Sequence, residues 1–397
     1  MLPRRVVRSV LALSALLSGD ADKTPGTRYV PALAALRSGN VRRVLALATL
    51  LFAGACFPQT IQTDRGPRGI PMGPPGWNLE IREHVDLWLH GYAMLSPYES
   101  TLPFFRRGYR EEMAAIRARD NTFTLLDANA DRLAPHLTSN PSLVNGQFAP
   151  MYFPSWAELR DGIDALLRVN GNVSRAGGGE RRAVAILQRM FPSAEDREWL
   201  RTFAISLDDE RTKFYDAYWQ DRQRRAMPAF TAADAALRAA TGGPLLRYMT
   251  NANLRRGTVL MSLPLGGEGR SVLEGVERSH IAVPRPVDAD SGEAVVFVFV
   301  HELVGPAVGI ASREFTGELP RGLSAEAYET SSLVRAGHHL LQRADPELAV
   351  RYARYYVGLA GRDPGADPEA ALAAVFPLPS ALQSAVFAQV DEVWEGI

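Results

Sequence analysis

The chain has 397 residues, of which 46% are hydrophobic and 22% charged, and its 44 basic and 44 acidic side chains give no net charge. This balance excludes the basic footprint of a nucleic-acid-binding protein, and the apolar fraction excludes a disordered chain. A single cysteine, Cys56, excludes an intrachain disulfide framework. The length is sufficient for about two or three domains, each with its own core.

The first feature in chain order is an export signal that ends at Cys56. Residues 41–55 contain two arginines, a short apolar run and the small residues Ala-Gly-Ala, which are the three parts of a secretory signal peptide. The apolar run is too short for an ordinary membrane-spanning helix. Small residues followed directly by a cysteine resemble a bacterial lipobox, which implies that Cys56 is lipidated and becomes the mature N-terminus. Cleavage after Ala55 without lipidation and an uncleaved anchor are the alternatives.

Residues 1–40 contain a second basic and apolar run, although a signal peptide is expected at the very N-terminus. The tandem runs predict that translation starts near Val41 and that residues 1–40 are an extension. Residues 56–77 are rich in proline and glycine and lack periodicity, which predicts an extended tether. We therefore expect an exported protein of the bacterial cell envelope, anchored to membrane lipid through Cys56.

Residues 78–248 are predicted to form a helical domain, because apolar residues recur there at helical spacing. His84 and His90 are six residues apart and lie on different faces of a helix, so they do not form a metal pair by themselves. Aromatic residues cluster between Pro192 and Arg225, and we expect them to pack in the core. The predicted helices cover residues 79–95, 104–119, 125–137, 156–169, 181–190 and 192–225.

Residues 249–397 are predicted to form a second domain that begins with two strands, at 258–265 and 279–286. The glycine-rich stretch 266–270 between them predicts a hairpin turn. The next segment, 290–309, is the most apolar part of the expected mature protein and carries His301 and Glu302 after six apolar residues. Its β-branched residues favour a strand, whereas Asp290 and Glu293 form a possible capping box for a helix beginning near Ser291. We predict a helix that Pro306 kinks or ends.

An apolar helix that ends in His-Glu resembles the zinc-binding helix of zincin-type metallopeptidases, whose motif is HExxH. The segment here reads HELVG, with Gly305 at the position of the second histidine. The resemblance implies that His301 is a zinc ligand and that Glu302 is the general base. It also implies a cleft-edge strand before this helix, with Glu268 and Arg270 at the rim. The predicted fold class is α+β, predominantly α-helical, and zincin-like, with a small β-sheet or hairpin preceding the His-Glu helix.

A further helical stretch, residues 324–361, follows a polar loop. In the gluzincin-type peptidases that the chain resembles, a downstream helix supplies a glutamate ligand, and Glu326 and Glu329 are the candidates here. His338 or His339 could replace the ligand missing at Gly305. The predicted site therefore has Glu302 as catalytic residue and His301, His338 and Glu329 as ligands of a possible Zn²⁺. A final helix is predicted from Ser380 to Trp394.

These features predict an envelope protein with a zincin-like fold that lacks a complete zinc site and has a binding or structural role. The alternative is an active zinc-dependent peptidase in which Glu302 acts on the water that attacks a peptide substrate. A third hypothesis is an unrelated exported helical protein, in which His301 and Glu302 form a buried hydrogen-bonded pair. The predicted partners are membrane lipid and either a peptide substrate or another envelope protein, and no nucleic acid.

Overall fold

The computed structural model describes residues 76–96, 102–273, 279–321 and 323–397. The predicted extension, the signal peptide and Cys56 lie outside these residues, as does the tether up to residue 75. Gly76 and Trp77, expected at the end of the tether, instead begin a strand, β1 (Gly76–Glu80). Trp77 is only 2% exposed and its Nε1 donates a hydrogen bond to the carbonyl of Leu254 at 2.8 Å, so this end of the tether is part of the fold.

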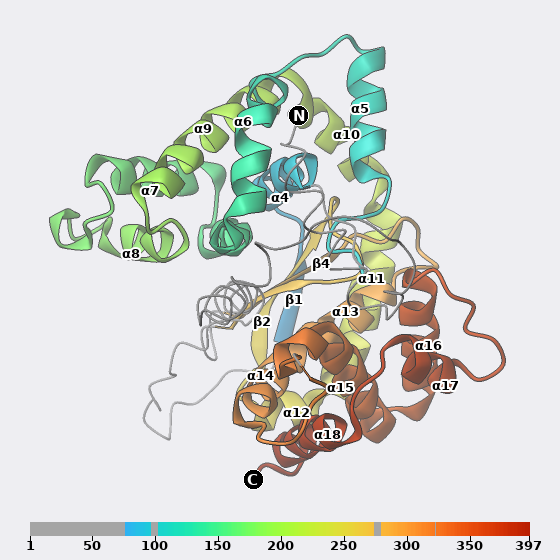
Figure 1. The fold of residues 1–397 in the computed structure, drawn as a ribbon. Helices are drawn as coiled ribbons and strands as arrows, with labels where there is room; N and C mark the ends of the chain where they lie inside the picture. Colours follow the sequence, from blue (N-terminus) through green and yellow to red (C-terminus); the bar gives the residue numbers. More distant parts are fainter. Residues whose placement is uncertain (1–75, 97–101, 274–278, 322) are drawn as a thin grey trace, which may run out of the picture. The chain divides into compact units, whose positions relative to one another are not determined.

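The described residues are mainly helical with one small mixed sheet, which confirms the predicted α+β class. The sheet has the order β1-β2-β4-β3 and is shown in Figure 1. Strands β1, β2 and β4 are parallel, whereas β3 at the edge is antiparallel to β4. The bounds of the last three are β2 (Arg256–Ser262), β3 (Arg270–Leu273) and β4 (Ser279–Pro284).

The predicted hairpin is wrong. The segments expected to pair as its two arms contain β2 and β4, which are neighbours but run parallel, with Thr258 opposite His280. A tight turn cannot join parallel strands, which need a longer crossover. The chain makes this crossover by running back along the outer side of β4 as β3. The glycine-rich stretch 266–269 leads into β3, and it therefore lies at an edge of the sheet.

A first set of helices packs around one hydrophobic core, which contains Trp88, Trp199 and Phe203. Within the predicted helix 192–225, five residues form a π-helical turn, and the helix runs on through it. The members of this set are α4 (Glu83–Leu95), α5 (Tyr109–Arg119), α6 (Leu125–Ser139), η1 (Pro141–Tyr152), α7 (Trp156–Arg168), η2 (Val173–Arg175), α8 (Arg181–Met190), α9 (Ala194–Glu210), η3 (Arg211–Tyr215) and α10 (Asp216–Arg225).

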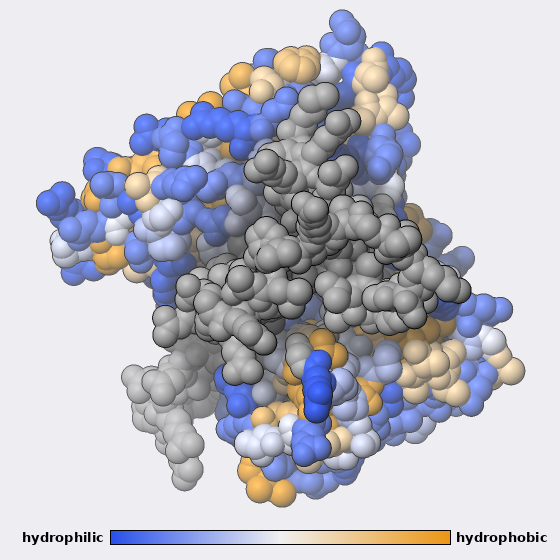
Figure 2. All heavy atoms as spheres, viewed as in Figure 1, coloured by the Kyte–Doolittle hydropathy of each residue, from blue (hydrophilic) through white to orange (hydrophobic). Residues whose placement is uncertain are grey.

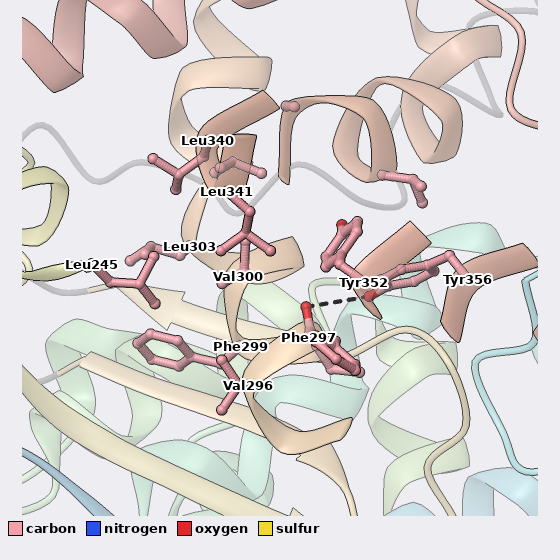
Figure 3. Packing of buried hydrophobic residues seen from close by; sticks show 14 of the residues in the cluster. Leu245, Val296, Phe297, Phe299, Val300, Leu303, Leu340, Leu341, Tyr352 and Tyr356 are labelled. Carbon is pink, nitrogen blue, oxygen red and sulfur yellow. Dashed lines mark hydrogen bonds between the residues drawn. The ribbon is translucent and has the colours of Figure 1, made fainter. Parts of the chain in front are cut away.

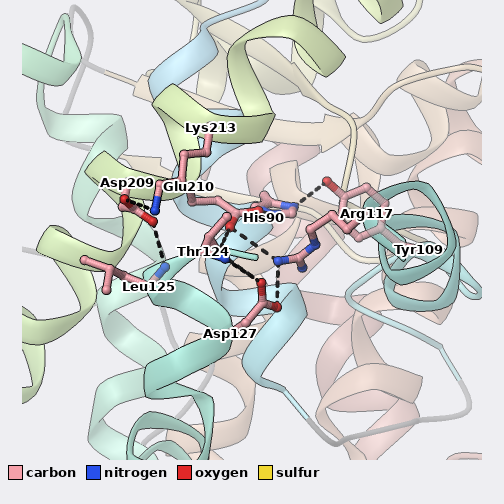
Figure 4. Close-up of polar contacts among 9 residues, drawn as sticks. All are labelled: His90, Tyr109, Arg117, Thr124, Leu125, Asp127, Asp209, Glu210 and Lys213. Atoms are coloured by element: carbon pink, nitrogen blue, oxygen red, sulfur yellow. Dashed lines mark hydrogen bonds and ion pairs between the residues drawn. The ribbon is translucent and has the colours of Figure 1, made fainter. Parts of the chain in front are cut away.

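A buried polar network ties four of these helices together (Figure 4). His90 of α4 lies between Tyr109 of α5, 3.0 Å from its Nδ1, and Glu210 of α9, 2.9 Å from its Nε2. The other oxygen of Glu210 accepts hydrogen bonds from Arg117 and Thr124. Removing one partner from such a buried ion pair is costly, because the remaining charge stays desolvated. The network therefore accounts for His90 as a structural residue.

A second core joins the sheet to the remaining helices. It includes Trp77 and Leu79 of β1, so the segment that begins the predicted helical domain contributes to the sheet of the other half. The helices around this core are α11 (Met227–Gly242), α12 (Leu246–Asn251), α13 (Ala294–Leu303), α14 (Gly305–Glu314), η4 (Ala325–Tyr328), α15 (Glu329–Ala344), α16 (Pro346–Leu359), α17 (Pro368–Val375) and α18 (Ser380–Glu395).

Helix α13 lies at the centre of the second core (Figure 3). Every side chain from Val295 to Val300 is buried, as expected for a helix that is apolar on all sides. The predicted capping box is wrong, because the helix starts at Ala294 after Glu293, which makes no side-chain cap. Ser291 belongs instead to a turn in which it bonds Asp288. The predicted break at Pro306 is confirmed, since α13 ends at Leu303 and α14 begins at Gly305.

The described surface carries mostly hydrophilic residues with scattered hydrophobic ones on the face shown in Figure 2. The run Ala294–Glu314 is long and apolar enough to cross a membrane, and 78% of its most apolar stretch is buried inside the protein. Helices α17 and α18 pass the same test only as a pair, which is bent by 117°. Core helices of globular proteins share this length and composition, and α13 packs as one.

Candidate functional site

His301 lies in the last turn of α13 and is 1% exposed. Its ring stacks on Tyr356 of α16, with centroids 5.6 Å apart and an interplanar angle of 22°. Its Nε2 is 4.0 Å from Oε1 of Glu302, and its Nδ1 has no hydrogen-bond partner. Burial lowers the pKa of His301 from its ordinary value of 6.5 to about 3, and the positive charge of Arg270 lowers it further in the same direction. The imidazole is therefore neutral at physiological pH.

Glu302 follows directly and contacts the loop that leads into β3. Burial raises the pKa of its carboxyl from 4.5 to about 7, and the nearby charge of Glu268 raises it too. Arg270 opposes this rise, as do hydrogen bonds from the Ser271 hydroxyl and the Gly269 backbone. A Cβ on Gly269 would lie 2.7 Å from Cγ of Glu302, so only glycine lets the loop come this close. The Glu302 carboxylate is thus held by the Ser271 side chain and by the backbone of Gly269.

Arg270 and Glu268 form the polar wall opposite α13. Arg270 Nη1 lies 3.6 Å from Oε2 of Glu268, and the Nε of the same arginine donates to Oε1 of Gln147 at 3.2 Å. Its guanidinium lies 3.5 Å from the ring centroid of Phe104. Thr330 donates to the other oxygen of Glu268 at 3.3 Å. Burial raises the pKa of Glu268, and Arg270 counteracts this effect.

These groups line a small cavity of about 50 Å³, which is large enough to hold water. The edge strand and the loop before it contribute Glu268, Arg270 and Ser271. The other walls come from η1, α13, α14 and α15, through Phe148, His301, Glu302, Gly305, Val308, Glu329, Thr330 and Leu333. Three positions singled out by the family resemblance, His301, Glu302 and Glu329, therefore meet in one cavity, together with Gly305.

The histidines of α15 lie elsewhere. His338 Nε2 is 2.9 Å from Oε1 of Glu369 on α17, and His339 Nε2 is 2.9 Å from Oδ1 of Asp391 on α18. The ring of His339 also stacks on Phe387. Neither histidine lines the cavity with His301. Of the sequence-predicted residues, the structure brings together His301, Glu302 and Glu329, and it places His338 in a separate contact with Glu369.

The donor set around His301 does not fit a zinc ion. Among the residues that the structure describes, no group of three or more histidine, cysteine, aspartate or glutamate side chains is arranged to hold a metal. A catalytic zinc ordinarily has three protein ligands at about 2 Å. The second histidine position is Gly305, which has no donor side chain, and the guanidinium of Arg270 places a positive charge beside the cavity.

Sequence reasoning placed Glu268 and Arg270 at the rim of a cleft but did not identify Ser271, Thr330 or Gln147. Ser271 directly follows Arg270 in the chain, and Thr330 directly follows Glu329. Their positions next to two candidate residues could have identified them. Gln147 is 123 residues from Arg270 in the chain, and nothing in its local sequence points to this contact.

Comparisons of the chain with protein-family models, with curated proteins and with solved structures find no match. Function is therefore inferred from the fold and the cavity.

Proposed function

We propose that the chain is an exported, lipid-anchored envelope protein whose zincin-like domain uses the cavity at His301 and Glu302 as a binding site without a complete zinc site. The observation that carries the binding role is the cavity itself, whereas export and the lipid anchor rest on the sequence around Cys56. The cavity gathers His301, Glu302 and Glu329, while Gly305 and Arg270 occupy positions that oppose metal binding.

The order of elements supports the zincin-like part of the proposal. The resemblance implies a strand at the cleft edge before the His-Glu helix, and β3 is an edge strand that gives Arg270 and Ser271 to the cavity. It also implies a glutamate from a downstream helix, and Glu329 at the start of α15 lines the same cavity. The outer edge of β3 lies near η1, because Arg270 of β3 donates a hydrogen bond to Gln147 of η1. The proposal therefore does not include pairing of a substrate strand with β3.

Binding is favoured because the polar groups are already held in place. Glu302 accepts hydrogen bonds from Ser271 and Gly269, and Glu268 accepts one from Thr330. Groups fixed before a ligand arrives lose little conformational entropy when it binds. A concave site with a few fixed polar groups among apolar side chains is the usual form of a ligand site.

A second candidate function is a zinc-dependent peptidase with Glu302 as general base, which is the role of the glutamate in the HExxH helix of zincins. One observation favours it: the pKa of Glu302 is raised to about 7, a value suited to a general base at neutral pH.

Metal analysis of the full chain separates the two candidates. We expect zinc well below one atom per chain, and equal rates for wild type and Glu302→Gln in a peptide-cleavage assay. Glu318→Gln is the matched control, because Glu318 is exposed and does not line the cavity. Stoichiometric zinc, together with peptide cleavage that Glu302→Gln abolishes and Glu318→Gln does not, would contradict the binding role and support the peptidase.

The lipid anchor has its own test at Cys56. We expect Cys56→Ser to abolish incorporation of a labelled fatty acid and to release the protein from the membrane fraction, because the serine hydroxyl replaces the thiol that would carry the lipid. Pro58→Ala, two residues further on, should label like wild type. Undiminished labelling of Cys56→Ser would contradict the lipid anchor and leave the cavity proposal intact.

A further inference from the structure

A serine hydroxyl and a carboxylate contact each other in the cavity. Ser271 lies in β3 and Glu302 in the last turn of α13, and both residues line the cavity. Ser271 donates a hydrogen bond to the Glu302 carboxylate, and the backbone N–H of Gly269 donates a second one. A nucleophile that is hydrogen-bonded to a base, with the base held in place by a third group, is the arrangement that activates a serine.

The positive charge beside this pair has the sign that acyl transfer requires. Arg270 directly precedes Ser271 in the chain, and its charge acts on both His301 and Glu302. Glu268 lies 3.6 Å from the guanidinium and helps to fix its position. When a serine attacks an acyl group, negative charge develops on the carbonyl oxygen, and a fixed positive charge in a buried site stabilises it. The same charge that opposes a metal ion therefore favours an oxyanion.

His301 provides a place for a water molecule next to Glu302. Its Nδ1 has no hydrogen-bond partner among the described residues, and its Nε2 is 4.0 Å from Oε1 of Glu302, which is too far for a direct hydrogen bond. Buried polar atoms ordinarily have a partner, and one bridging water spans a gap of this length. A water bound there is in contact with a carboxylate that can take its proton.

The size of the cavity limits the acyl group that it can accept. A volume of about 50 Å³ holds a few water molecules, so it suits a group no larger than acetyl or propionyl. Phe148, Val308 and Leu333 provide apolar contacts for the methyl end of such a group. Glu329 and Leu333 are half-buried, so the cavity lies next to the protein surface.

We propose that the cavity hydrolyses short-chain acyl esters without a metal, with Ser271 as nucleophile, Glu302 as its base and Arg270 beside the oxyanion. The inference rests on the proposed function, because the ester would bind in the same cavity.

The reaction has two steps. In the first, the Ser271 oxygen forms a bond to the acyl carbon and its proton passes to Glu302. The bond from the acyl carbon to the alcohol oxygen then breaks, and Glu302 gives the proton to the departing alcohol. In the second step, the water between His301 and Glu302 gives a proton to Glu302 and its oxygen bonds to the acyl carbon. The proton returns to Ser271 as the carboxylic acid leaves.

The test is reaction of the full chain with p-nitrophenyl acetate at about pH 8, where Glu302 is ionised because its pKa is about 7. Acid quenching and peptide mass mapping locate the acetyl group, which we expect on Ser271. Glu302→Gln should slow ester hydrolysis at least about 100-fold, the effect of losing a general base. Ser271→Ala should lose both the adduct and hydrolysis above background, whereas the control Ser324→Ala should match wild type, because Ser324 is exposed and does not line the cavity.

The adduct on the wild-type chain decides the case even if a variant does not fold, which circular dichroism shows. Ser271→Cys, whose thiol is also a nucleophile, should still accept the acetyl group. Absence of an acetyl group on Ser271 would overturn the inference. Equal hydrolysis by wild type and folded Ser271→Ala would also overturn it, and if that hydrolysis depended on Glu302 it would indicate direct attack by water. Either result with metal-free protein leaves the proposed binding role standing, whereas stoichiometric zinc with Glu302-dependent peptide cleavage overturns that role.

Discussion

Replacing Phe299 with alanine should lower the free energy of unfolding by about 3–5 kcal/mol, the range observed when a buried phenylalanine is truncated. Phe299 is fully buried in α13, and its ring makes an edge contact with Trp77 of β1, with centroids 4.9 Å apart. Truncation would leave a cavity between the central helix and the first strand. The loss would be measured by urea denaturation followed by circular dichroism.

The matched control is Phe123→Ala, because Phe123 is 70% exposed. Its substitution should change the free energy of unfolding by no more than about 0.5 kcal/mol. A loss below about 1 kcal/mol for Phe299→Ala would contradict the packing of α13 against β1. The site depends on this packing, because α13 carries His301 and Glu302 in its last turn.

Acid should destabilise the protein through His301. Its pKa is lowered from 6.5 to about 3 in the folded state, so the unfolded chain binds the additional proton between these pH values. The contribution of His301 to stability is therefore present above pH 6.5 and is lost as the pH falls towards 3. The difference between the pKa values of His301 in the unfolded and folded states corresponds to about 5 kcal/mol of stability, at about 1.36 kcal/mol for each unit of pKa.

Glu302 acts in the opposite direction. Its pKa is raised from 4.5 to about 7, so its contribution is present below pH 4.5 and is lost as the pH rises towards 7. The other groups around His301 are Arg270, whose charge lowers the pKa of His301, and Tyr356, which stacks on its ring. The two titrations therefore oppose each other where their pH ranges overlap.

Urea denaturation across pH 3 to 8 would separate the two contributions, with pH limits chosen to span both titrations. His301→Phe keeps an aromatic ring against Tyr356 and removes the titrating group, so it should flatten the loss of stability in acid. Glu302→Gln should make the gain of stability between acid and neutral pH larger than in wild type. Identical pH profiles for His301→Phe and wild type would contradict the buried, neutral state of His301.

The sequence predicted the elements that depend on local pattern. The helices α4 to α10, the helix at 294–303, its break at Pro306 and the final helix follow from the spacing of apolar residues and from proline stereochemistry, whereas the 3₁₀ segment η1 was not predicted. The start of the central helix was predicted wrongly, because the capping box at Asp290 and Glu293 does not form. The side chain of Ser291 bonds Asp288 instead, and the two alternatives have similar local signatures.

Part of the site could be predicted from the positions of residues along single helices. His301 and Glu302 are adjacent and follow an apolar run, so their position at the end of a buried helix could be predicted. Glu329 could be named as a candidate because it lies on a downstream helix, but His338 was an equally plausible choice. The structure gives His338 a partner in Glu369 and places Glu329 at the cavity.

By itself the sequence determined the helical class, the burial of α13 and the adjacent His301 and Glu302 at its end, because each depends on residues within a few turns of one another. Only the tertiary structure decided that β2 and β4 run parallel, that β3 forms the edge, and that the charge of Arg270 lies near His301 and Glu302. Those outcomes depend on contacts between distant segments, such as Arg270 with Gln147, 123 residues apart. Helical periodicity repeats every 3.6 residues and carries no information about such contacts.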